Sequence, residues 1–302
     1  MLKPPEHQVA GHQAREGQLG PLVDGSGRFY KPLQSDSRGE HEAAFYSSFS
    51  SDPRVPSHVR RFFPGFHGTQ LLPASDGSGE RPHLVLDDIF SSLLRPSVID
   101  LKIGACTWPP NSPDNYLMKC LRKDLETTSL TLGFRISGLR VNTASGFYNP
   151  DKNQVKSYTS SSDVKRVLKK FVSSNPDSSS DPDCAFAAVV YGGSEGLLAQ
   201  LLELKAWFED QTLYHFYSVS VLVGYARDEV GKTRPLVKLV DFAHVVEGDG
   251  VIDHNFLGGL CSLIKFISEI LIDPDEKFSS GCCLEESKRT PQLGIENGGL
   301  DE

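Results

Sequence analysis

The sequence lacks the features of several large protein classes. Its six cysteines show neither the paired spacing of a zinc site nor the density of a disulfide framework, so we expect reduced thiols. The N-terminus has no apolar stretch of the kind found in secretory signals. No apolar run approaches the ~20 residues of a membrane span. Lys and Arg total 31 against 39 Asp and Glu, and because nucleic-acid binding usually needs a basic face, no stable nucleic-acid complex is expected.

The composition that remains is that of a globular protein with a sizeable core. Of the 302 residues, 38% are hydrophobic and 9% aromatic, which suits one large domain or two lobes that share a cleft. The net charge of −8 means that an anionic ligand must be captured by a local cluster of cations. We expect a monomer located in the nucleus and cytoplasm.

Two apolar segments far apart in the sequence carry strand-end acids. Residues 98–103 form a β-branched run typical of a buried strand, and Asp100 and Lys102 are set into it. Because residues i and i+2 of a strand point to one face, their side chains should emerge together. A structural ion pair is the plainer alternative. A second apolar run, residues 237–240, ends in Asp241. Two such acids and a lysine suit phosphoryl transfer, in which one acid holds Mg²⁺ and the lysine neutralises charge.

A second lysine lies near the N-terminus in a context typical of kinases. Residues 22–25 and 28–31 predict two strands around an Asp-Gly turn, with Lys31 in the second strand. Residues 39–48 predict a helix that contains Glu42. A strand lysine paired with a helix glutamate is the arrangement by which kinases hold nucleotide phosphates. An exposed surface lysine is the alternative.

Residues 83–88 predict a strand that ends in acids. In a two-lobed kinase this is the place of the hinge, whose backbone pairs with adenine. The sequence therefore indicates Leu86 and Asp87 as the nucleotide contacts of this segment, with Asp87 near the ribose or the adenine amine.

Residues 116–125 predict a helix with Lys119, Arg122 and Lys123 on or near one face. A solvated face is the ordinary explanation of such a cluster. Here the cations closely follow Asp100 and Lys102 in an acidic chain, which favours a role in binding phosphates. Arg140 is a further candidate phosphate contact.

Three further helices and one further strand are predicted from apolar periodicity. Ser162 and Asp163 are expected to cap the first of these helices, and the last should bury its positions 256, 260, 263, 267 and 270. Residues 276–302 are polar and predict a disordered tail. The segments are a helix over 162–171, a helix over 197–208, a strand over 217–223 and a helix over 256–271.

A different enzyme class is suggested by Gly192-Gly193-Ser194-Glu195-Gly196, which fits the Gly-x-Ser-x-Gly nucleophile elbow. Asp241 and His254 follow in the order of an α/β-hydrolase. That fold needs several parallel strands before the elbow, and the first 180 residues predict hairpins and loops instead. A glycine-rich turn with Ser194 as a helix N-cap is the plainer account. A non-catalytic phosphoinositide-binding scaffold is a third alternative.

The segment Pro96-x-x-x-Asp100-x-Lys102-x-Gly104 resembles the signature of the inositol phosphate kinases, and Asp241-Phe242-Ala243-His244 resembles their metal-binding motif. The likeness spans most of residues 6–272 and is nearest to the plant multikinases. Further matching segments occur in the same order, namely His7 to His12, Lys31 to Gln34, Glu126 to Ser129, Gly133 to Arg135 and Asp253 to Phe256.

The resemblance implies an α+β, two-lobed kinase-like fold, related to the protein kinases and ATP-grasp enzymes, with an inserted helical segment (108–128) that binds inositol phosphates. The implied lobes are residues 1–90 and 91–275. Implied partners are ATP with Mg²⁺, inositol tris- and tetrakisphosphates, and as a further class phosphoinositide lipid headgroups. The implied residues are Asp100 and Lys102 for catalysis; Lys31, Glu42, Leu86, Asp87, Asp100 and Val240 for ATP; Asp241 and Ser220 for the metal; and Lys102, Lys119, Arg122, Lys123, Arg140 and His244 for the substrate.

Overall fold

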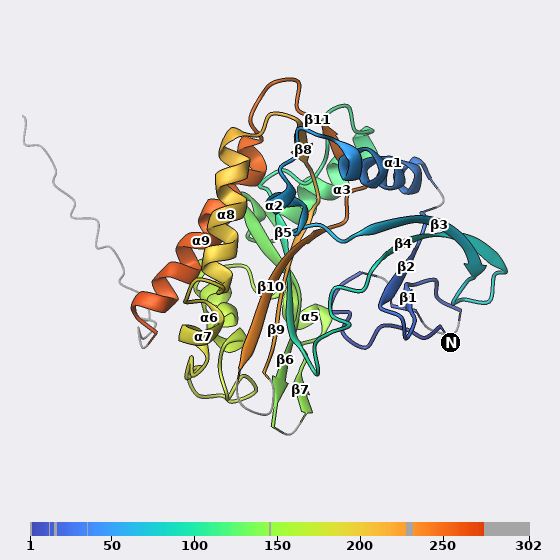
Figure 1. Ribbon diagram of the computed structural model, residues 1–302. Coiled ribbons are helices and arrows are strands. Elements are labelled where there is room, and N and C mark those ends of the chain that lie inside the picture. Colours follow the sequence, from blue (N-terminus) through green and yellow to red (C-terminus); the bar gives the residue numbers. More distant parts are fainter. Residues whose placement is uncertain are drawn as a thin grey trace, which may run out of the picture.

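The computed structural model describes residues 2–11, 13–14, 17–34, 36–144, 146–227 and 232–274. Two main sheets, a smaller and a larger one, are antiparallel and lie side by side, and helices cover the outer face of the larger one (Figure 1). The predicted tail, together with Cys282 and Cys283, lies outside the described residues. The other four cysteines are free thiols, as expected.

The smaller sheet has the strand order β1-β2-β4-β3. Strands β1 (Leu22–Val23) and β2 (Arg28–Pro32) form the predicted hairpin, in which the Asp24 carboxylate accepts hydrogen bonds from the Ser26 and Arg28 amides. Strands β3 (Phe66–Pro73) and β4 (Glu80–Asp87) complete the sheet. Lys31 therefore lies on a strand with a hydrogen-bonded neighbour on each side.

The larger sheet has the strand order β10-β9-β5-β6-β7, and all of its pairings are antiparallel. Strand β5, which carries Asp100 and Lys102, is the middle strand. The predicted strand over 217–223 begins only at residue 220, because Ser218 adopts a left-handed backbone with φ of 56°. The five strands are β5 (Ser97–Ile103), β6 (Phe134–Thr143), β7 (Gly146–Tyr148), β9 (Ser220–Arg227) and β10 (Thr233–Val240).

This topology excludes the hydrolase alternative. The α/β-hydrolase elbow needs a strand before the serine, whereas helix α7 (Ala187–Val190) precedes Ser194. The sheet is also antiparallel rather than parallel. The expectation that Ser194 caps the next helix was wrong as well, because the N-cap of α8 (Leu197–Asp210) is Gly196.

Helices α6 (Ser161–Phe171), α8 and α9 (His254–Ile272) cover one side of the larger sheet (Figure 1). Helix α6 begins at a capping box of Ser160 and Asp163, so the cap lies two residues earlier than predicted. In α9 the five predicted core positions are buried, which confirms the periodicity. By length and composition alone α9 could cross a membrane, so the expectation about apolar runs was wrong; this helix nevertheless packs against α8, β5 and β6.

An aromatic cluster joins the N-terminal helices to the larger lobe. The ring centroid of Phe45, in α1 (Ser37–Ser51), lies 4.6 Å from that of Phe242. The ring centroid of Phe63, which follows the next helix, lies 5.3 Å from that of Phe242. Phe216, in β8 (Tyr214–Phe216), belongs to the same cluster. The cluster places the first turns of α1 beside the segment that follows Asp241.

The remaining elements are short, apart from the helix that carries the three predicted cations. That helix, α3, spans Asp114–Leu125, close to the predicted bounds. The others are α2 (Ser57–Arg60), α4 (Ser129–Leu132), α5 (Lys152–Lys156) and β11 (Val245–Glu247), which pairs with β8.

Candidate active site

Lys31, Glu42 and Asp241 meet between the two sheets. The Lys31 Nζ donates to Glu42 Oε1 at 2.8 Å and to Asp241 Oδ1 at 2.9 Å. The Glu42 side chain is 3% exposed, and its Oε1 also accepts from the Phe242 amide at 3.1 Å. Although burial favours the neutral lysine, Asp241 and then Glu42 raise the pKa of Lys31 above its usual range. The predicted strand lysine and helix glutamate therefore form an ion pair.

Asp241 also reaches the lysine of the central strand. Lys102 Nζ lies 3.3 Å from Asp241 Oδ2 and donates to the Ser218 carbonyl at 2.7 Å. Partial burial favours a neutral carboxyl, but Lys31 and then Lys102 hold the pKa of Asp241 well below its usual range. Asp241 has a left-handed φ of 72°, a conformation that non-glycine residues adopt mainly where the surroundings enforce it. Its carboxylate is 45% exposed and open to a ligand.

Asp100 and Ser220 lie next to this bridge and hold unused oxygen atoms. Ser220 pairs with Lys102 in the register of β9 and β5. Asp100 Oδ1 and Ser220 Oγ are buried without hydrogen-bond partners, although the Ser220 hydroxyl lies close enough to lower the pKa of Asp100. Burial raises that pKa, Lys102 opposes the shift, and Asp241 adds to it.

These oxygens fit a divalent cation. Magnesium and similar ions prefer carboxylate and hydroxyl oxygen ligands, and Asp241, Asp100 and Ser220 supply them near one another on the larger sheet. Within the described ranges no group of three His, Cys, Asp or Glu residues could hold a metal by itself. A cation here would therefore take further ligands from phosphate oxygens and water.

Of the three predicted cations of α3, Lys123 is the one that the structure brings near Lys102. Partial burial, and then the positive charges of Arg135 and Lys102, lower the pKa of Lys123 to about 8. Lys119 and Arg122, like Lys123, are exposed to solvent on this helix. The crowding of three cations in an acidic protein is what a bound anion would relieve.

His244 closes the site between α3 and α1. Its Nε2 lies 2.8 Å from the Tyr116 hydroxyl. Burial, then the charges of Arg38 and Lys102, lower the pKa of His244 to about 4, so the imidazole is neutral at pH 7. The sequence patterns did not identify Tyr116, Arg38 or His41 as site residues. Their only signal was a position in the first turns of α3 and α1.

Arg140 is not brought to this site. In the register of β6 and β5, Arg135 pairs with Lys102, whereas Arg140 pairs with Val98 at the other end of the strand. The Arg140 guanidinium lies 3.5 Å over the Phe147 ring. A phosphate contact from Arg140 in this site would need a different register.

The predicted hinge lies at the end of β4, beside Gly65 and Arg28. The Asp87 amide donates to the Gly65 carbonyl at 2.9 Å, and the Asp87 carboxylate accepts from Arg28 at 2.6 Å. The side chain of Leu86 is buried. Burial lowers the pKa of Lys238 and Asp87 opposes that shift, so Asp87 lies within electrostatic reach of β10. The adenine contacts of Leu86, Asp87 and Val240 stay predictions.

The sequence is similar to one family of known proteins. The family model described as inositol polyphosphate kinase matches residues 83–268. The inositol polyphosphate multikinase beta of Arabidopsis thaliana is 55% identical over 301 residues, which cover 96% of this chain and 100% of that protein. The inositol polyphosphate multikinase IPK2 of Oryza sativa subsp. japonica is 59% identical over 291 residues, covering 92% of this chain and 98% of that protein.

Solved structures show the same fold. A solved inositol phosphate multikinase is 48% identical with a TM-score of 0.66, and the match covers 76% of this chain and 99% of that one. The inositol phosphate multikinase Ipk2 of S. cerevisiae, in complex with ADP and Mn²⁺, is 18% identical with a TM-score of 0.61 and covers 81% and 99%. At that identity the yeast protein supports the fold alone.

Proposed function

This chain belongs to the inositol polyphosphate kinase family, and from that premise we propose that it transfers phosphate from ATP to soluble inositol polyphosphates. The proposed substrates run from inositol trisphosphate to the tetrakis- and pentakisphosphates. One observation carries the proposal: the Asp241 carboxylate lies 2.9 Å from Lys31 and 3.3 Å from Lys102. Phosphoryl transfer needs such charges around the transferred group, because its catalysis is mainly positioning and electrostatic stabilisation.

On the nucleotide side, Lys31 supplies the charge for the ATP phosphates. Glu42 holds the Lys31 ammonium in place, and because Glu42 also accepts from the Phe242 amide, it ties α1 to the segment after Asp241. The N-terminal lysine is thereby fixed relative to the carboxylate of the larger lobe.

On the acceptor side, Asp100 and Lys102 face the reacting hydroxyl. Asp100 Oδ1 has no partner in the described part of the chain, so an inositol hydroxyl can donate to it. Burial raises the pKa of Asp100, which strengthens its carboxylate as an acceptor of that proton. Lys102 attracts the transferred group, while Lys123 and the neutral His244 are placed to hold phosphates of the acceptor.

The proposed divalent ion is Mg²⁺, held by Asp241 with Ser220. When bound, it neutralises charge on the nucleotide phosphates. The melting temperature tests this ligand set. Adding ADP with Mg²⁺ should raise the melting temperature of the native protein and of the control variant Asp163→Asn, which alters the cap of α6. The same addition should raise the melting temperature of Asp241→Asn much less. An equal rise in Asp241→Asn would exclude this ligand set.

Product mapping tests the function. The protein is incubated with ATP and a panel of inositol phosphates, and products are identified by anion-exchange chromatography and NMR. Asp241→Asn should stay folded and lose at least about a hundredfold in turnover, the usual cost of one lost electrostatic contact in the transition state. Asp163→Asn, at the distant cap of α6, should keep turnover. Near-normal activity of folded Asp241→Asn would refute the assignment.

Three narrower points are proposed with it. Phosphoinositide headgroups would fit the same cations, and phosphorylation of lipid in mixed micelles tests this. A monomer is expected in light scattering, and a dimer mass would contradict it. Nuclear and cytoplasmic location is tested by a fluorescent fusion, whose restriction to one compartment would contradict it.

A further inference from the structure

Helix α3 carries the substrate cations, and its apolar side chains Tyr116, Leu117 and Leu121 are only half-buried. Its one buried residue is the carboxylate Asp124. The apolar side chains of Met118 and Leu125 are 56% and 63% exposed. The helix N-cap, Pro113, makes no side-chain cap bond. Half-buried apolar side chains and the Tyr116 contact to His244 help to hold this helix, and its fully buried contacts are those of Asp124.

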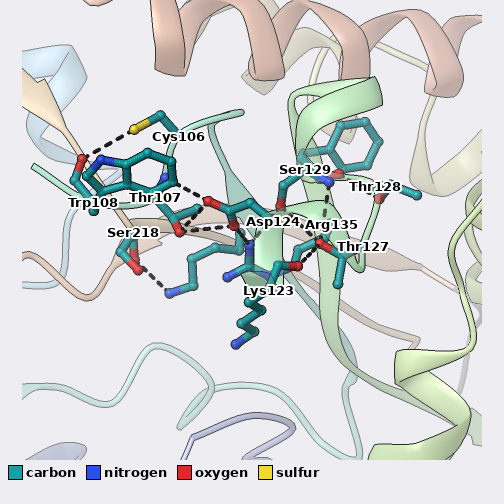
Figure 2. Close-up of polar contacts among 12 residues, drawn as sticks. Cys106, Thr107, Trp108, Lys123, Asp124, Thr127, Thr128, Ser129, Arg135 and Ser218 are labelled. Carbon is teal, nitrogen blue, oxygen red and sulfur yellow. Dashed lines mark hydrogen bonds and ion pairs between the residues drawn. The ribbon is translucent and has the colours of Figure 1, made fainter. Parts of the chain in front are cut away.

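Asp124 lies at the centre of a buried hydrogen-bond network (Figure 2). Its carboxylate accepts from the Thr107 amide at 3.1 Å, from the Thr107 hydroxyl at 2.8 Å and from Arg135 Nη1 at 2.6 Å. Arg135 Nη1 also donates to Ser129 Oγ at 2.7 Å. Thr107, Asp124 and Arg135 are 2%, 0% and 4% exposed, so water does not compete for these contacts.

The network connects α3 to the loop after β5 and to the neighbouring strand β6. Thr107 lies in the loop that leaves β5 after Ile103, and Arg135 pairs with Lys102 in the register of β6. Lys123 directly precedes Asp124 and lies within electrostatic reach of Lys102 and Arg135. Hydrogen bonds are directional, so they fix the rotation of the helix and with it the direction of the neighbouring lysine.

We propose that Asp124, Thr107 and Arg135 form a positioning triad that sets Lys123 against Lys102 and so determines the affinity for the phosphates of the inositol substrate. This inference rests on the proposed function. A buried ion pair adds little net stability over apolar packing, so a role in fixing geometry accounts for its presence here. Asp124 acts through Lys123 and does not touch the substrate.

The first test separates substrate binding from turnover. Asp124→Asn and Thr107→Val should each raise the KM for inositol trisphosphate, by about tenfold for Asp124→Asn, the worth of one charge-assisted contact. The KM for ATP and kcat should stay within about twofold. Thr107→Ser keeps both contacts and should restore native values. Asp163→Asn, which breaks a cap far from the site, serves as the matched control and should change neither KM.

A double-mutant cycle gives the decisive readout. If Asp124 acts by placing Lys123, then Lys123→Gln should raise KM about tenfold in the native protein but less than about twofold in the Asp124→Asn background. If the effects of Lys123→Gln and Asp124→Asn on the KM for inositol trisphosphate multiplied in the double variant, the proposal would be overturned. A rise in the KM for ATP as large as that for inositol trisphosphate would also overturn it. Thr107→Val replaces Asp124→Asn in the cycle if the latter does not fold.

Calorimetry keeps this inference separate from the proposed function. Binding of inositol trisphosphate without ATP gives the same cycle with no turnover. A native protein that binds inositol trisphosphate but does not phosphorylate it would refute the function and leave the triad testable. If the native protein is a kinase but Asp124→Asn and Thr107→Val bind inositol trisphosphate as tightly as it does, the triad alone is refuted.

Discussion

Lys123 should make substrate affinity fall as pH rises through 8. Its pKa is lowered to about 8 by partial burial and by Arg135 and Lys102, against about 10.4 for a free lysine. About nine-tenths of Lys123 is therefore charged at pH 7 and about one-tenth at pH 9. A bound phosphate favours the charged form, so this part of the affinity is present below pH 8 and is lost as pH rises above it.

The magnitude follows from the exposure of the lysine. A charge-assisted contact is worth roughly 1.5–3 kcal/mol, but part of this side chain is open to solvent, which reduces the value to about 1.4 kcal/mol, or tenfold in affinity. The KM for inositol trisphosphate should therefore rise about fivefold to tenfold between pH 7 and pH 9.5. Phosphate monoesters complete their second ionisation near pH 6, so the ligand charge changes little over this range.

Steady-state kinetics at saturating ATP measure the effect, with two variants as controls. Lys123→Arg stays charged throughout and should give a flat KM, whereas Lys123→Gln should give a high KM that is also flat. Arg140→Gln removes a cation that lies away from the site and should follow the native curve. If the KM of Lys123→Arg rose with pH as the native KM does, Lys123 would not be the group responsible.

Three further substitutions test other parts of the site. Glu42→Gln removes the buried partner of Lys31 and should raise the KM for ATP about tenfold while leaving that for inositol trisphosphate; equal rises in kinetic assays would contradict the assignment. Tyr116→Phe removes the 2.8 Å contact to His244 and should raise the KM for inositol trisphosphate about threefold to tenfold; an unchanged KM would exclude this contact from binding. Ser194→Ala should change the free energy of unfolding by no more than about 0.5 kcal/mol and leave activity intact, since α8 is capped by Gly196; lost activity would revive the hydrolase hypothesis.

The sequence by itself determined the local elements of the site. The β-branched run around Asp100 and Lys102 predicted β5, and apolar spacing predicted the buried face of α9. The Asp-Gly turn predicted the hairpin that carries Lys31. These patterns are local, because strand and helix periods depend on neighbouring residues.

The tertiary structure decided which charges meet beyond the predicted pair of Lys31 and Glu42. Strand order and register placed Arg135 rather than Arg140 beside Lys102, and they brought Asp241 between Lys102 and the distant Lys31. No local pattern shows that Asp124 is buried, since it lies in a run of charged residues on an exposed helix. Its burial depends on Thr107 and Arg135, which approach only when the chain folds. Charge pairing in this site is therefore non-local, because the antiparallel register fixes which side chains face each other.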